Sequence, residues 1–99
     1  MFESTKPLYM TRAVAEELPD EHKHFMVQYF HENHEMLKDY LQVFEFSITG
    51  KKQLLRQKQE QPHRETQIFV ALKETKAISR TVWAMDQVDH VIILFPEDY

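Results

Sequence analysis

Cysteine is absent from the sequence and glycine occurs once, at Gly50, and both shortages restrict the chemistry that the protein can perform. Without cysteine there is no thiol nucleophile and no thiolate metal ligand. A single glycine cannot form the glycine-rich loop that cradles phosphate groups in nucleotide-binding proteins. The lack of cysteine also fits a protein of a reducing compartment.

Long apolar runs are missing too, and no run approaches the ~18 residues of a membrane-spanning helix. Residues 1–6 lack the basic segment and apolar core that mark a secretion signal. None of the serines lies in the G-x-S-x-G pattern of a nucleophile elbow. We therefore expect a cytoplasmic protein with no membrane partner, and the sequence favours a non-enzymatic role.

The length of 99 residues, with 42% hydrophobic and 28% charged residues, predicts one globular domain over residues 1–99. A domain of this size removes roughly two-thirds of its unfolded surface from water, so its folding needs no disulfide, metal or cofactor. The net charge of −4 is unevenly placed: residues 51–80 hold eight cations and three anions, so this segment carries +5 and the remainder −9. This asymmetry suggests a surface with a basic and an acidic side, but we favour the simpler interpretation that solvated strands carry the lysines.

The apolar segment at residues 91–95, Val-Ile-Ile-Leu-Phe, organises the expected fold. It has the length of one strand and no polar face, which is typical of a strand buried on both sides. Such a strand at an open edge would favour aggregation. We therefore expect it to have paired neighbours on both sides and a covering layer.

A helix that begins around Leu18-Pro19-Asp20-Glu21 supplies this cover, because proline and acidic residues suit the first turn of a helix. At about 100° per residue, one side of the helix is mostly apolar. We interpret His22 on that side as a core or boundary histidine. The predicted buried face consists of His22, Phe25, Met26, Tyr29, Phe30, Asn33, Met36 and Leu37.

Alternating or β-branched residues predict four further strands, at 8–14, 39–48, 65–72 and 77–85. Gly50 predicts a hairpin turn after the second of these strands. Residues 52–61 have helix propensity but no apolar stripe, and there we favour a polar, exposed strand over a helix.

The predicted order is therefore β-α-β-β-β-β-β, which indicates an α+β fold. Because the strands follow one another through short connections, we expect an antiparallel, strongly curved sheet of five or six strands. One amphipathic helix packs on this sheet.

Two groups of polar side chains suggest metal sites. Six histidines occur, but His31-Glu32-Asn33-His34 is one residue shorter than the H-E-x-x-H pattern of metalloproteases. Asp86, Asp89 and His90 have ligand chemistry suited to a cation, although aspartates in turns usually bond their own backbone. A metal-dependent hydrolase at this turn is therefore the least favoured hypothesis.

The basic stretch at residues 51–64 suggests nucleic-acid binding as an alternative function. Its cations could contact phosphates, but it lacks the aromatic residues on which single-stranded bases stack. The candidate phosphate-binding residues are Lys51, Lys52, Arg56, Lys58 and Arg64. The leading hypothesis is a non-enzymatic accessory or regulatory protein that acts by binding another protein, with a homodimer as one form of that binding.

Several short motifs resemble those of a small family known as domain of unknown function 960, found in low-GC Gram-positive bacteria. The motifs are Tyr9-Met10-Thr11-Arg12, Asp39-Tyr40-Leu41-Gln42-Val43-Phe44, Gln59-Glu60-Gln61-Pro62 and Asp86-x-x-Asp89-His90. The resemblance covers nearly the whole chain and implies one compact cytoplasmic domain, with no assigned activity. The chain departs from the family pattern at Ala13, where glycine is frequent, and at Gln87, where a second acid is frequent.

Overall fold

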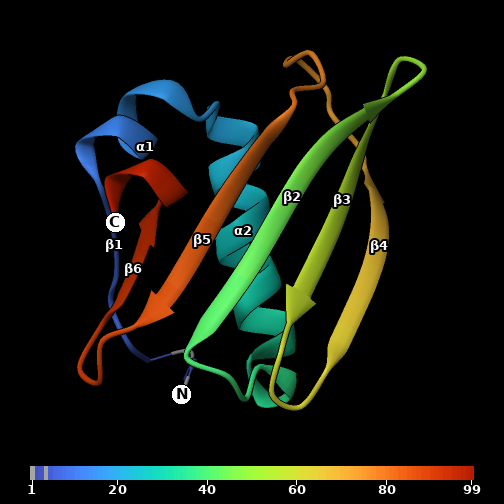
Figure 1. Ribbon diagram of the computed structural model, residues 1–99. Coiled ribbons are helices and arrows are strands. Elements are labelled where there is room, and N and C mark those ends of the chain that lie inside the picture. The colour runs from blue at the N-terminus through green and yellow to red at the C-terminus, as the bar shows by residue number, and fades with distance from the viewer. Residues whose placement is uncertain (1, 4) are drawn as a thin grey trace.

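The computed structural model describes residues 2–3 and 5–99 and shows a six-stranded sheet with a long helix, α2, across one face (Figure 1). The strand order is β1-β6-β5-β2-β3-β4. The elements are β1 (Leu8–Met10), α1 (Arg12–Glu17), α2 (Asp20–Asn33), η1 (His34–Met36), β2 (Leu41–Thr49), β3 (Lys52–Gln59), β4 (Arg64–Val70), β5 (Arg80–Asp86), β6 (Val91–Leu94) and η2 (Pro96–Asp98), where η marks a 3₁₀ turn.

Strand β6 has paired neighbours on both sides, which confirms the position predicted for the apolar segment 91–95. It pairs antiparallel with β5 and parallel with β1. Val91 and Ile93 are buried in the core. The expectation of a purely antiparallel sheet is wrong, because β1 and β6 run in the same direction. A parallel pair needs a long crossover, and here most of the chain lies between the two strands.

The predicted first strand, residues 8–14, is correct only as far as Met10. Residues from Arg12 onward form α1, because Thr11 caps this helix by accepting a hydrogen bond from the Val14 amide at 3.3 Å. The Arg12 and Glu16 side chains, one helical turn apart, form an ion pair at 2.8 Å. A local cap therefore overrides the strand propensity of this segment.

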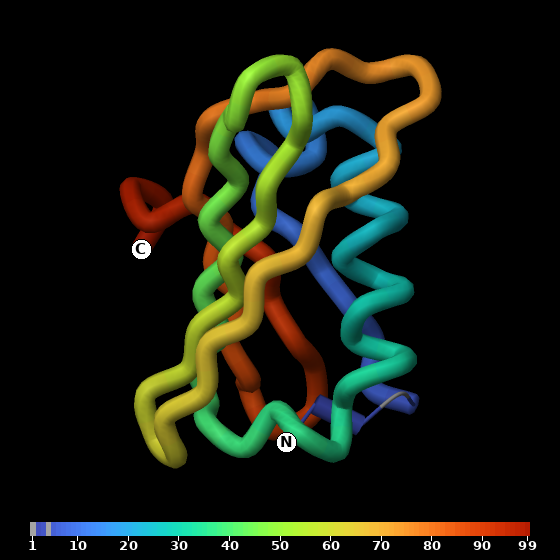
Figure 2. Tube along the Cα trace, turned by 90° about the vertical axis from the view of Figure 1, so that its right-hand side faces the viewer, coloured from blue at the N-terminus to red at the C-terminus, as the bar shows by residue number. Residues whose placement is uncertain are grey.

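Helix α2 begins at Asp20, directly after Pro19, and covers the inner face of the sheet as predicted. Figure 2 shows the helix and the sheet as two separate layers. The rings of Tyr29 and Phe30 both pack edge-on against Phe44 of β2, with centroids 5.5 and 5.4 Å apart. The helix ends at Asn33, so Met36 lies beyond it and is exposed, contrary to the predicted helix face.

The predicted hairpin and the strand predicted at 52–61 are both confirmed. Gly50 has a φ of +64°, the left-handed conformation that favours glycine, and β2 pairs with β3 on either side of it. The expectation that this strand is exposed is wrong. Its residues alternate between the two faces, and Gln53, Gln57 and Gln59 point inward and are almost fully buried.

The buried amides form a directed hydrogen-bond chain beneath α2, which we call the glutamine chain (Gln57, Gln42 and Gln59). The Gln57 amide nitrogen donates to Gln42 Oε1 at 2.7 Å, and the Gln42 amide nitrogen donates to Gln59 Oε1 at 2.8 Å. Gln59 Nε2 then donates to the carbonyl of Pro62 at 2.8 Å. Each side chain thus accepts at its oxygen and donates at its nitrogen, so burial leaves both groups satisfied.

Gln59 also fixes the segment that joins the helix to β2. Its Oε1 accepts hydrogen bonds from the backbone amides of Lys38 at 2.8 Å and Asp39 at 3.1 Å. The Asp39 carboxylate in turn accepts a bond from the backbone amide of Gln61 at 3.0 Å. The two connections at this end of the sheet are therefore held together by side-chain to backbone bonds.

A second buried pair supports the opposite end of α2. Gln53 Oε1 accepts from the Ile78 amide at 2.8 Å and lies 2.9 Å from His22 Nε2. An amide oxygen only accepts, so His22 carries a proton on Nε2. His22 Nδ1 has no hydrogen-bond partner among residues 2–3 and 5–99. His22 is a core residue as predicted, with one of its two ring nitrogens satisfied.

Glu21, in the first turn of α2, holds the loop between β4 and β5. Its carboxylate accepts hydrogen bonds from the backbone amides of Lys73, Glu74 and Thr75 at 2.7, 2.8 and 2.6 Å. These backbone amides, that of Lys73 foremost, lower the pKa of Glu21 to about 2. The loop is thereby tied to the helix by one ionised side chain.

We expect Gln59→Met to lower the free energy of unfolding by about 2–4 kcal/mol. The backbone amides of Lys38 and Asp39 and the side-chain amide of Gln42 lose the oxygen that accepts their hydrogen bonds, and burial keeps some of these donors from water. Urea unfolding followed by circular dichroism measures this loss. Gln61→Met is the matched control, because the Gln61 side chain is exposed, and its effect should stay within about 0.5 kcal/mol. Equal losses in the two variants would contradict the role given to the glutamine chain.

Glu21→Gln should weaken the loop attachment in a pH-dependent way. The folded-state pKa lies below the ordinary value of 4.5, so the stabilisation is complete above that pH and disappears as the pH falls toward about 2. The difference in unfolding free energy between the wild type and Glu21→Gln should therefore shrink over this interval. Amide hydrogen exchange at Lys73, Glu74 and Thr75 should be faster in the variant at neutral pH.

The exposed Glu35 provides the control for this experiment, since no hydrogen bond or ion pair joins its side chain to any residue in 2–3 or 5–99. Glu35→Gln should leave the exchange of the three loop amides unchanged. Exchange rates that do not differ between Glu21→Gln and the wild type would disprove the attachment.

Candidate functional site

The outer face of the sheet, which points away from α2, carries two apolar rows that cross several strands. The register aligns Tyr9, Ile92, Met85 and Leu41 in one row. It aligns Leu94, Trp83 and Val43 in the next. We call these seven residues the outer patch. Figure 1 views the sheet from this face, with α2 behind the strands.

The outer patch is covered only in part. Met85 and Leu94 are buried, Trp83 and Ile92 are half-buried, and Tyr9 is 55% exposed. Tyr99 packs edge-on against Trp83 with ring centroids 6.1 Å apart. Figure 2 shows the C-terminal turn on this side of the sheet, away from α2.

The other half of the outer face is mostly polar, with Leu54 and the exposed Phe69 as its apolar residues. Lys58 and Arg56 point outward from β3, and both have acidic neighbours on adjacent strands. Lys58 forms an ion pair with Glu45 at 3.1 Å, and Arg56 lies 3.9 Å from Glu65. This half therefore has the alternation typical of a sheet that faces water. A small cavity of about 200 Å³ lies where the two halves meet, with Tyr40 and Val43 among its lining residues.

A groove of about 480 Å³ separates α2 from the edge strand β4. Phe25, Tyr29 and Glu32 are among the helix residues that line it, and Arg64 and Ile68 lie on the strand side. Arg64 Nη1 donates to the Tyr29 hydroxyl at 2.9 Å and to Gln57 Oε1 at 3.0 Å. The guanidinium of Arg64 is thus joined to the first amide of the glutamine chain.

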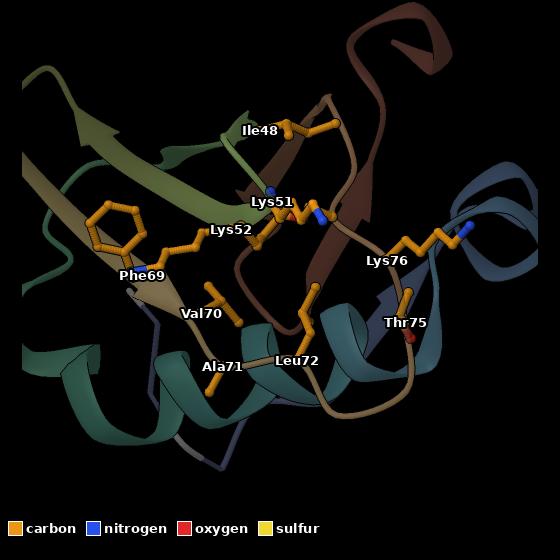
Figure 3. A pocket seen from close by; sticks show the side chains of 11 residues that line it. Ile48, Lys51, Lys52, Phe69, Val70, Ala71, Leu72, Thr75 and Lys76 are labelled. Atoms are coloured by element: carbon orange, nitrogen blue, oxygen red, sulfur yellow. The ribbon is translucent and has the colours of Figure 1, made fainter.

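A cavity of about 830 Å³ lies beside the β2–β3 hairpin, and Figure 3 shows its lining. Its rim carries Lys51, Lys52 and Lys76, while Val70 and Leu72 contribute apolar surface. In Figure 3, Lys52 reaches toward Phe69, and its Nζ lies 5.7 Å from the centre of that ring. Lys76 points away, so the three ammonium groups do not converge on one point.

The five cations proposed for phosphate binding are divided between the two faces of the sheet. Lys52, Arg56 and Lys58 share the outer face of β3, where Arg56 and Lys58 have carboxylate neighbours and Lys52 lies with Lys51 at the hairpin cavity. Arg64 lies on the opposite face, in the groove next to α2. Nucleic-acid binding stays a prediction.

Asp86, Asp89 and His90 do not converge as one set of ligands. Asp86 pairs with Lys6, whereas Asp89 pairs with His90. Asp86 accepts a hydrogen bond from Lys6 Nζ at 2.6 Å, and Asp89 lies 2.7 Å from His90 Nδ1. The neighbouring His90 lowers the pKa of Asp89, and Asp86 raises the pKa of Lys6. Within residues 2–3 and 5–99, no three His, Asp or Glu side chains are arranged to hold a metal ion. The hydrolase hypothesis stays a prediction.

Sequence reasoning missed the glutamine chain and the groove. One available signal was the alternation in β3, where glutamines at 53, 57 and 59 share one face and cations at 52, 56 and 58 share the other. The groove had no local signal, because its two walls come from residues 25–33 and 64–68, which are far apart in the sequence.

Comparison with known proteins places the fold and gives no activity. The model is similar to the crystal structure of a protein of unknown function from Enterococcus faecalis, with a TM-score of 0.85 and 20% sequence identity over 99% of this chain and 94% of that chain. No curated protein matches the sequence. In residues 2–3 and 5–99, no helix combines the length and apolar character needed to cross a membrane.

The resemblance stated from the short motifs is confirmed over most of the chain. Residues 8–98 match the family model described as staphylococcal protein of unknown function (DUF960), and the chain therefore belongs to this family.

Proposed function

We propose that the protein is a non-enzymatic accessory or regulatory module that binds another protein through the outer patch. The observation that supports this proposal is the difference between the two halves of the outer face. Outward positions on β3 and β4 are charged or polar except Leu54 and Phe69, whereas seven outward residues of β1, β2, β5 and β6 form two apolar rows. A contiguous apolar patch beside polar residues is typical of a protein interaction site.

The composition of the outer patch also favours protein binding. Tyrosine and tryptophan are the residues that most often dominate binding energy, and Tyr9 and Trp83 lie in neighbouring rows. Burying the remaining exposed part of each large side chain contributes a fraction of the ~1.5–3 kcal/mol expected for full burial. The nearby cavity beside Tyr40 can receive one protruding side chain of the partner.

A second copy of the chain is one partner that the outer patch can accept, because the apolar faces of two sheets can cover each other. The cytoplasm is the proposed location, supported by the absence of cysteine from the sequence. The proposal involves no catalytic step and no cofactor.

Photo-crosslinking tests this proposal. We expect benzoylphenylalanine at position Tyr9 to give a discrete crosslinked product in cells, because that side chain is 55% exposed at the margin of the patch. A product of twice the 12.0 kDa chain mass identifies a second copy, and any other discrete mass identifies a different protein. Trp83→Thr should reduce the yield of the product.

The control places the same crosslinker at Gln67, which points outward from β4 in the polar half. Thermal unfolding of each variant establishes that it is folded. The proposal is wrong if Tyr9 and Gln67 give the same products in the same yield, or if Trp83→Thr leaves the Tyr9 product unchanged.

A further inference from the structure

The edge strand β4 presents an open side to the groove beside α2. The sheet ends at β4, which pairs with β3 through seven consecutive residues and has no strand on its other side within the described chain. Alternate residues of such an edge direct their N–H and C=O groups outward, where another strand can bind them. Residues 64–70 contain no proline or glycine that would interrupt this pairing.

The groove has the dimensions of a short extended peptide. Its strand wall runs from Arg64 to Ile68, about 13 Å at ~3.3 Å per residue. Its helix wall runs from Phe25 to Asn33, about 12 Å at ~1.5 Å per residue. A helix beside an open edge strand is the arrangement in which several domains bind an extended peptide as an added strand.

The two ends of the groove differ in polarity. Ile68 pairs with Leu55, and Arg64 pairs with Gln59, so the strand becomes more polar toward Arg64. Phe25 and Ile68 supply apolar surface, whereas Glu32 lines the groove among the helix residues nearer the C-terminal end of α2. Side chains on one face of an added strand recur every second residue, so positions opposite Arg64 and Ile68 are four residues apart.

Arg64 is fixed in place but has hydrogen-bonding capacity left over. Its Nη1 bonds to Tyr29 and Gln57, both neutral acceptors that hold the guanidinium in one orientation. Within the part of the chain that the structure describes, no carboxylate forms an ion pair with it, and Nε and Nη2 have no acceptor. Those two nitrogens form the fork that binds a carboxylate through two parallel hydrogen bonds.

A second copy of the chain does not complete this groove. The side chains of β4 that point toward the groove face are Arg64, Thr66, Ile68 and Val70, and none is acidic. Pairing β4 with the β4 of another copy would therefore bring an arginine, a threonine or an apolar residue to Arg64, and no carboxylate. The charge of the groove favours a partner segment of different composition.

We propose that the groove binds an extended segment of a partner protein, which adds to the sheet beside β4 as a seventh strand. The segment carries a carboxylate that binds Arg64 and, four residues away, an apolar side chain that packs against Phe25 and Ile68. This site is separate from the outer patch and goes beyond the function proposed for it, because the groove and the patch lie on different faces of the sheet.

Selection from a phage library of random peptides on the purified, immobilised full chain tests the site. We expect the enriched peptides to share an acidic and an apolar residue separated by three positions. Arg64→Gln should weaken the binding of a synthetic enriched peptide at least about tenfold, the usual scale for losing a charge-assisted bidentate contact. Replacing the acidic residue of the peptide with its amide should give a similar loss.

Arg64→Gln also removes the hydrogen bonds from Arg64 to Tyr29 and Gln57, so it can lower stability as well as affinity. A second variant therefore separates binding from folding. Glu32→Gln removes a negative charge from the groove at an exposed position, and we expect it to strengthen peptide binding about two- to fivefold. Glu65→Gln, on the opposite face of β4, is the matched control and should leave the affinity unchanged. Trp83→Thr should also bind the peptide normally, which distinguishes this site from the outer patch.

Backbone contacts provide an independent readout. Bound peptide should slow the amide hydrogen exchange of alternate residues of β4, and a peptide with a methylated backbone nitrogen on its bonding edge should bind more weakly. The proposal is overturned if no peptide is enriched, or if enriched peptides bind Arg64→Gln and Glu32→Gln as they bind the wild type. Self-association that Arg64→Gln abolishes would replace the peptide with a second copy.

Discussion

The burial of three glutamine amides beneath one helix is the constraint on which the rest of the structure depends. A buried amide without partners costs free energy, so Gln42, Gln57 and Gln59 stay in the core only because each bonds the next. The chain that results joins Arg64 at one end to the carbonyl of Pro62 at the other. A single hydrogen-bond network therefore connects Tyr29 of α2, the groove arginine and the loop after β3.

The same architecture leaves two surfaces for binding. One helix covers one face of the sheet, and the apolar rows around Trp83 on the opposite face are only partly covered. The sheet also ends at β4, where Arg64 is held by neutral groups and retains its charge for a ligand. Both surfaces follow from the small size of the fold: six strands and one long helix cannot close every face and edge.

Much of the fold could be predicted because its signals are local. The turn at Gly50 and the helix after Pro19 depend on residues next to one another in the sequence. Segment 91–95 was placed correctly because a strand with two apolar faces has few stable environments. One error was local, because Thr11 ends β1 by capping a helix. The other arose where distant residues decide, because the parallel partner of β6 is the first strand of the chain. The alternation in β3 placed its glutamines on one face, but it did not show that this face is buried, since their hydrogen-bond partners come from other strands and loops.

The sequence by itself determined the family, the α+β class, the helix that covers the sheet and the hairpin at Gly50, because periodicity and turn chemistry act over a few neighbouring residues. Only the tertiary structure decided which polar residues are buried and where the cations lie. It separated Arg56 and Lys58, which face carboxylates on the outer face, from Arg64, which lies under the helix. The physical reason is the two-residue period of a strand: adjacent residues point to opposite faces, and only the packing of the helix decides which face becomes the core.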